Sequence, residues 1–83
     1  MNLRNRNIEA DVLWALVQEG GLATYETVCD RVNRRRPEHI MQATGYLLDE
    51  HSIENVGSCW RITRAGRRRC GALRMETVQT ELL

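Results

Sequence analysis

The sequence predicts a mainly helical α+β fold, in which one small β-hairpin accompanies several helices within a single domain spanning residues 1–83. Two observations lead to this prediction. Three segments before residue 51 repeat apolar residues at the spacing of helices that bury one face. A Gly57-Ser58 pair then stands between two short stretches in which apolar and polar residues alternate, as expected of a two-residue hairpin.

The first helix is predicted over residues 8–19. Asn7 can cap its start, because a short polar side chain accepts hydrogen bonds from free backbone N–H groups, and Gly20-Gly21 ends it. Trp14 lies off the centre of the apolar face. The residues of that face recur at helical spacing: Ile8, Val12, Leu13, Leu16 and Val17.

A second helix is predicted over residues 25–33, after a short extended link at Leu22-Ala23. Thr24 is its expected N-cap. Its apolar residues follow the i, i+3, i+4, i+7 pattern of one buried face: Tyr25, Val28, Cys29 and Val32.

A third helix is predicted over residues 37–50, because Pro37 suits the first position of a helix and a polar connection rich in arginine precedes it. The residues expected on its inner side are Ile40, Met41, Thr44, Leu47 and Leu48. The residues expected on its outer side are Glu38, Gln42, Gly45, Tyr46 and Asp49, with His39 at the margin.

The two-residue turn also fixes the register of the hairpin. The expected pairs are Val56 with Cys59, Asn55 with Trp60, Glu54 with Arg61 and Ile53 with Ile62. One face is then apolar, and the other brings Glu54 opposite Arg61, a favourable pair of opposite charges. Thr63 is the expected N-cap of a fourth helix over residues 64–80.

Two short segments carry a family resemblance. The segment after the hairpin turn, Trp60-Arg61-Ile62-Thr63-Arg64-Ala65-Gly66, and the end of the third helix, Leu47-Leu48-Asp49-Glu50, resemble corresponding segments of bacterial winged-helix regulators. Together with the order of the elements, the resemblance covers about residues 8–66. It implies a winged helix with a three-helix body, a hairpin wing and an extra C-terminal helix.

The resemblance implies that the third helix enters the major groove of DNA. The base-reading candidates on its outer side are His39, Gln42, Gly45 and Tyr46. Gln42 is the best of them, because an amide can bond bidentately to adenine. Glu38 and Asp49 on the same helix would be repelled by phosphates.

Arginine clustering supports binding to a polyanion. All 12 basic residues are arginine, and although the net charge is only +1, residues 31–37 carry +4 and residues 61–75 carry +6. The phosphate-binding candidates are Arg34, Arg35, Arg36, Arg61, Arg64, Arg67, Arg68 and Arg69. Alternatively, these arginines pair with acids of the same chain, such as Glu9, Asp11 or Glu50.

The expected function is therefore that of a small, sequence-specific regulator of transcription that binds double-stranded DNA. Its size suits a phage or mobile-element regulator. The alternative is a winged-helix assembly module that binds an acidic protein partner. No catalytic constellation, metal site, cofactor motif or small-molecule site is evident, so an enzyme is not expected.

A homodimer is expected, because two domains related by a two-fold axis can read a palindrome. The dimer candidates are Trp14, Met75, Val78 and Leu82. The alternative is that the C-terminal tail packs on the first helix of its own chain. No apolar run approaches the ~20 residues that span a bilayer, and no signal-peptide core is evident, so a cytoplasmic protein is expected.

Overall fold

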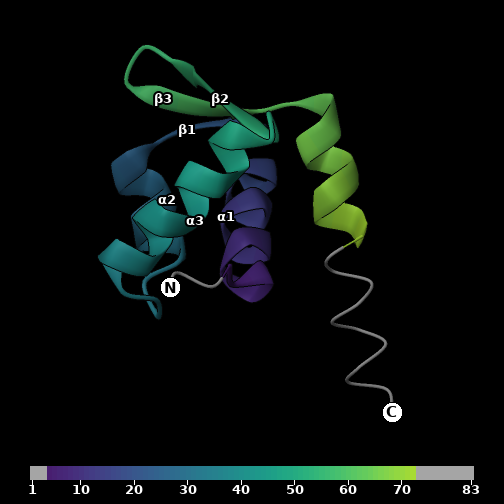
Figure 1. The fold of residues 1–83 in the computed structure, drawn as a ribbon. Helices are drawn as coiled ribbons and strands as arrows, with labels where there is room; N and C mark the ends of the chain where they lie inside the picture. The colour runs from purple at the N-terminus through teal and green to yellow at the C-terminus, as the bar shows by residue number, and fades with distance from the viewer. Residues whose placement is uncertain (1–3, 73–83) are drawn as a thin grey trace.

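The computed structural model describes residues 4–72, and these form a mainly helical body with a small antiparallel sheet (Figure 1). The elements are α1 (Arg6–Gln18), β1 (Leu22–Thr24), α2 (Tyr25–Arg31), α3 (Pro37–Asp49), β2 (Ile53–Val56) and β3 (Cys59–Ile62). Residues 64–72, here called the C-terminal segment, are also helical. The predicted continuation of this helix to residue 80 lies outside the described residues.

The sheet has three strands in the order β1-β3-β2, so β3 is central and both neighbours are antiparallel to it. All four predicted hairpin pairs are confirmed, including Glu54 opposite Arg61. Gly57 has φ +60° and Ser58 has no positive φ, as in a type II′ turn. The predicted extended link becomes β1, in which Ala23 pairs with Trp60.

The core lies between α1, α3 and the inner face of the sheet. Its largest fully buried apolar side chains are Leu13, Leu16, Ile40, Leu47 and Ile53. Tyr25 meets Trp60 edge to face, with ring centroids 5.5 Å apart, so α2 is joined to the sheet by an aromatic contact. Cys70 is also buried, which anchors the C-terminal segment to the core.

Three caps fix where the helices begin. Thr24 caps α2 as predicted, and the Thr63 hydroxyl accepts a hydrogen bond from Gly66 N at 3.0 Å at the start of the C-terminal segment. The predicted Asn7 cap is wrong. Asn5 caps α1 instead, because Asn7 itself is helical and its N–H donates to the Asn5 side chain at 3.0 Å.

The prediction that Met41 lies on the inner side of the third helix is also wrong. Met41 is 49% exposed, whereas Ala43 is buried. The buried stripe of α3 passes through positions 40, 43, 44 and 47, and Met41 lies about 100° around the helix from Ile40. The helix is therefore rotated so that its small alanine, rather than its methionine, faces the body.

Candidate nucleic-acid interface

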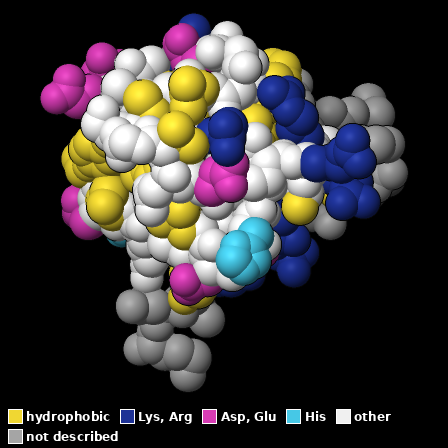
Figure 2. Space-filling model, turned by 90° about the horizontal axis from the view of Figure 1, so that it is seen from above, with side chains coloured by type: hydrophobic (Ala, Val, Ile, Leu, Met, Phe, Trp, Pro, Cys, Tyr) yellow, Lys and Arg dark blue, Asp and Glu magenta, His cyan; other side chains and the backbone are white. Residues whose placement is uncertain are grey.

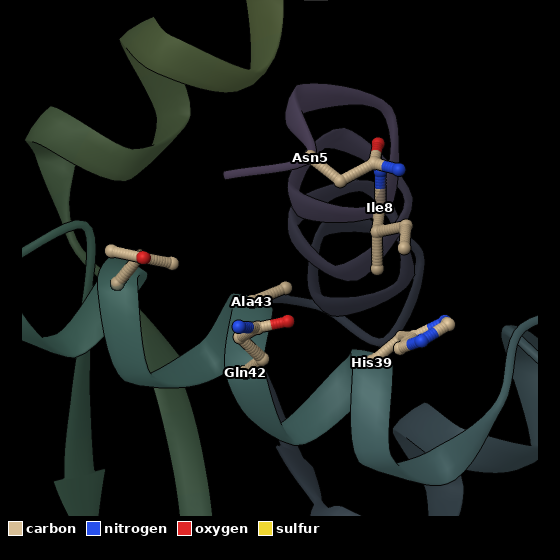
Figure 3. A pocket seen from close by; sticks show the side chains of 6 residues that line it. Asn5, Ile8, His39, Gln42 and Ala43 are labelled. Carbon is tan, nitrogen blue, oxygen red and sulfur yellow. The ribbon is translucent and has the colours of Figure 1, made fainter. Parts of the chain in front are cut away.

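The predicted base-reading residues lie along the outer side of α3, where His39 and Gly45 are exposed and Gln42 and Tyr46 are half-buried. Three of them line a hollow between α3 and the first turn of α1, with a volume of about 130 Å³. Figure 3 shows the hollow, with Asn5 and Ile8 reaching it from α1 and His39, Gln42 and Ala43 from α3. The outer side of this helix is therefore indented.

Asn5 belongs to this surface although the sequence did not single it out. Its Oδ1 accepts from the backbone N–H groups of Asn7 and Ile8, at 3.0 and 3.2 Å, so the N-cap holds the side chain in place. The Nδ2 group is left to donate elsewhere. Its proximity to α3 depends on how α1 packs, which local sequence does not reveal.

Arg4 connects the start of the described chain to α3. Its Cζ lies 4.9 Å from the centroid of the Tyr46 ring, a cation–π distance. Its guanidinium donates to both carboxylate oxygens of Glu9, whose side chain is fully buried, and to Glu50 Oε2 at 3.1 Å. The hydrogen bond to Glu9 raises the pKa of Arg4 above its ordinary value, so this cation stays charged.

Arg69 completes the same cluster from the C-terminal segment. Its Nη2 lies 3.9 Å from Glu9 Oε1, and its Nε lies 2.8 Å from Glu50 Oε1 without the alignment of a hydrogen bond. The Ser52 hydroxyl also donates to Glu50 Oε1 at 2.9 Å. Since Arg69 is engaged by two carboxylates, we assign it to stability rather than to the phosphate-binding surface.

Two further candidates share one acid. Arg34 Nη2 lies 3.0 Å from each carboxylate oxygen of Asp11, and Arg35 Nε donates to Asp11 Oδ2 at 3.1 Å. These bonds join the connection between α2 and α3 to α1. Arg61 pairs with Glu54 across the hairpin, with Nε donating to Oε1 at 2.6 Å. Intramolecular pairing therefore accounts for half of the eight predicted phosphate-binding arginines.

The other half has no acidic partner within residues 4–72, and it consists of Arg36, Arg64, Arg67 and Arg68. Figure 2 shows basic side chains gathered on the side of the molecule where Figure 1 has the C-terminal segment. The Arg67 guanidinium also lies close over Gly21, in the turn between α1 and β1.

Two of the unpaired arginines, Arg36 and Arg64, lie near opposite ends of α3. Arg36 is the N-cap residue of α3. Arg64 follows Thr63, whose hydroxyl donates to the carbonyls of His51 and Ser52 just beyond the C-terminus of α3. A helix of 13 residues is about 20 Å long. Arginines therefore lie near both ends of α3, and α3 itself contains no arginine or lysine.

The solvent-exposed face of the sheet combines apolar side chains with a pair of opposite charges. Leu22 and Val56 are both exposed there, beside the Arg61–Glu54 pair. Hydrophobic side chains also lie on the side of Figure 2 opposite the basic ones. Of the dimer candidates, Trp14 is 38% exposed on α1. Met75, Val78 and Leu82 lie outside the described residues.

Comparisons with known protein families, curated proteins and solved structures find no match to this chain. Within residues 4–72, no group of three or more histidine, cysteine or acidic side chains is arranged to hold a metal ion. No helix in that range is long and apolar enough to cross a membrane.

Proposed function

We propose that this chain is a winged-helix protein that binds double-stranded DNA, with α3 in the major groove and the β2–β3 hairpin as the wing. The order of the elements and the strand order β1-β3-β2 support the fold assignment. Helices α2 and α3, separated by the connection at residues 32–36, form the helix-turn-helix of this proposal.

The observation that carries the proposal is the position of the unpaired arginines at the two ends of α3. The major groove is about 12 Å wide and is bordered on both sides by phosphates. A helix about 20 Å long with Arg36 at one end and Arg64 near the other can therefore meet both phosphate backbones, with Arg67 and Arg68 following in the C-terminal segment.

Free arginines in the first turn of the C-terminal segment strengthen the argument. The N-terminus of a helix carries a partial positive charge, so cations there are unfavourable by about 0.3–1 kcal/mol. Arg64 and Arg67 occupy this turn without a carboxylate from within residues 4–72. A bound phosphate would remove the penalty and accept hydrogen bonds from the guanidinium groups.

Sequence preference, in this proposal, resides on α3. Because α3 has no arginine or lysine, we assign its exposed polar side chains to the bases and the unpaired arginines to the phosphates. Gln42 is the main candidate, with His39 and Tyr46 beside it and Gly45 permitting close approach. The biological role that fits is regulation of transcription by a homodimer on a palindromic site.

Measurement of duplex-DNA affinity as a function of salt tests the proposal. Four phosphate contacts predict a slope of log K against log salt of about −3.6, or about a hundred-fold loss of affinity between ~50 and ~200 mM salt. Arg68→Ala should reduce the slope by about 1, whereas Arg61→Ala, at a paired arginine, should change it less. Absence of affinity even at low salt would refute DNA binding.

A second function is favoured by one specific observation, the exposure of Met41 on α3 together with Leu22 and Val56 on the sheet. Apolar side chains exposed beside acidic ones suit a protein partner better than they suit phosphates. As an assembly module, the chain would lose partner binding on substitution Met41→Glu. As a DNA-binding protein, it would lose affinity on substitution Arg68→Ala instead.

A further inference from the structure

No arginine lines the hollow beside Gln42, and its chemistry points to a particular ligand. Its floor consists of the apolar side chains of Ile8 and Ala43, which are 5% and 4% exposed. Its rim consists of polar side chains from both helices, and no acidic residue lines it (Figure 3). Such a site fits a flat molecular edge that combines a methyl group with hydrogen-bonding atoms.

The rim residue Asn5 can act only as a donor toward this hollow. Both of the hydrogen bonds that its Oδ1 accepts come from the backbone of α1. Turning the amide over would lose the N-cap, so the Nδ2 group stays available for a ligand. The ligand atom beside Asn5 must therefore be an acceptor.

Gln42 offers the complementary pair of groups from α3. Its half-buried side-chain amide has a donor and an acceptor, and the structure gives it no partner within residues 4–72. The two groups match N7 and N6 of adenine in the major groove.

An adenine–thymine pair presents this combination of groups. In the major groove, thymine offers its 5-methyl group next to the O4 acceptor, and adenine offers N7 and the N6 amino group. A guanine–cytosine pair has no methyl group to occupy an apolar floor. We infer that the hollow binds the 5-methyl group of a thymine, with Asn5 donating to O4 and Gln42 bonding to an adenine.

The inference rests on the proposed DNA binding and names the base that is read. Its test begins with selection of bound duplexes from random DNA. Each thymine of the selected site is then replaced in turn by deoxyuridine, which lacks only the methyl group. At one position in each half-site the affinity should fall about four-fold, the factor that corresponds to burial of one methyl group.

Two variants on α3 test whether the affinity that the thymine methyl group contributes arises from its contact with the hollow. Ala43→Ser brings a hydroxyl group into the apolar floor, so the ratio of thymine to uracil affinity should fall toward one. Met41→Ser is the control on the same helix, because Met41 is 49% exposed and does not line the hollow, and it should keep the four-fold ratio. Thermal unfolding of both variants establishes that they are folded.

A second pair of variants tests whether the Asn5 Nδ2 group donates a hydrogen bond to thymine O4. Asn5→Ser keeps an N-cap residue of similar quality but removes the Nδ2 group, so thymine and uracil sites should lose affinity equally, by about two- to ten-fold. Asn7→Ser is the control, because Asn7 is exposed and does not line the hollow. It should leave both affinities unchanged.

The outcomes of these experiments distinguish the thymine inference from the proposed binding of double-stranded DNA. Tight, salt-dependent binding without a uracil effect at any thymine would overturn the inference and leave DNA binding intact. A uracil effect that persists in Ala43→Ser would locate the methyl contact elsewhere and would also overturn it. Absence of affinity for every duplex would overturn both proposals together.

Discussion

Gly66 lies directly against the backbone carbonyl of Ser52, since a Cβ built on Gly66 would stand 1.9 Å from that oxygen. The same carbonyl accepts the Thr63 N–H at 3.0 Å and the Thr63 hydroxyl at 3.1 Å. The hydroxyl in turn accepts from Gly66 N. The Thr-x-x-Gly segment therefore fastens the C-terminal segment to the turn that follows α3, and it allows no side chain at its fourth position.

Gly66→Ala should destabilise the protein by about 3 kcal/mol, because the Ser52 backbone and the Ile62 side chain leave no room for the added methyl group. The free energy of unfolding from chemical denaturation measures the effect. Gly71→Ala is the control in the same helical segment. Nothing lies within 4 Å of its added Cβ, so it should stabilise by about 0.5–1 kcal/mol. Equal stability of Gly66→Ala and the parent protein would contradict this packing.

His51→Gly should stabilise the protein by about 1 kcal/mol. His51 has φ +60°, a left-handed conformation that side chains disfavour and glycine accepts freely. It stands where α3 ends, between Glu50 and Ser52, and the Ser52 N–H donates to the Leu47 carbonyl at 2.9 Å. The temperature of thermal unfolding should rise accordingly. His39→Gly, within α3, should lower it instead.

Asp11→Asn should increase the affinity for duplex DNA. The Asp11 carboxylate holds Arg34 and Arg35, so its neutralisation frees two cations beside the start of α3. Each additional phosphate contact steepens the salt dependence of log K by about 0.9, so the slope should change by up to about −1.8.

The control for this substitution is Glu19→Gln, which frees Arg31 at the far end of α1. Its slope should match that of the parent protein. If Asp11→Asn leaves the salt dependence unchanged, the two arginines lie away from the bound DNA.

Local rules predicted the parts of this fold that local interactions determine. The hairpin register follows from a two-residue turn and from alternation, and both signals lie within residues 53–62. The caps Thr24 and Thr63 follow from single hydroxyl groups at helix starts. The wrong prediction of an Asn7 cap shows where such local rules fail, because Asn5 and Asn7 both satisfy the N-cap rule and only the structure distinguishes them.

The pairing of the arginines could not be predicted in this way. Arg34 and Asp11 are 23 positions apart, and Arg69 and Glu50 are joined only because the C-terminal segment folds back past α3. The exposure of Met41 has the same origin, because the rotation of a helix about its axis depends on how neighbouring elements pack. The hollow at Asn5 and Gln42 likewise exists only once α1 lies across α3.

Arg68 and Arg69 are neighbours in the chain, yet substitution of each should have a different effect. Arg69 stands between the fully buried Glu9 and Glu50, so Arg69→Ala leaves Arg4 as the remaining cation for these two carboxylates and should destabilise by about 2 kcal/mol. Arg68 is exposed and has no acidic partner within residues 4–72. Arg68→Ala should therefore keep the stability within about 0.5 kcal/mol and weaken binding to all duplexes alike.

Two measurements on the same pair of variants separate these roles: the free energy of unfolding and the affinity for duplex DNA at low salt. The expected result is a crossover, in which Arg69→Ala changes mainly the first quantity and Arg68→Ala mainly the second. If Arg68→Ala left the affinity intact while Arg69→Ala abolished it without loss of stability, the division between paired and unpaired arginines would be wrong. The phosphate-binding surface would then have to be assigned by some property other than the absence of an acidic partner.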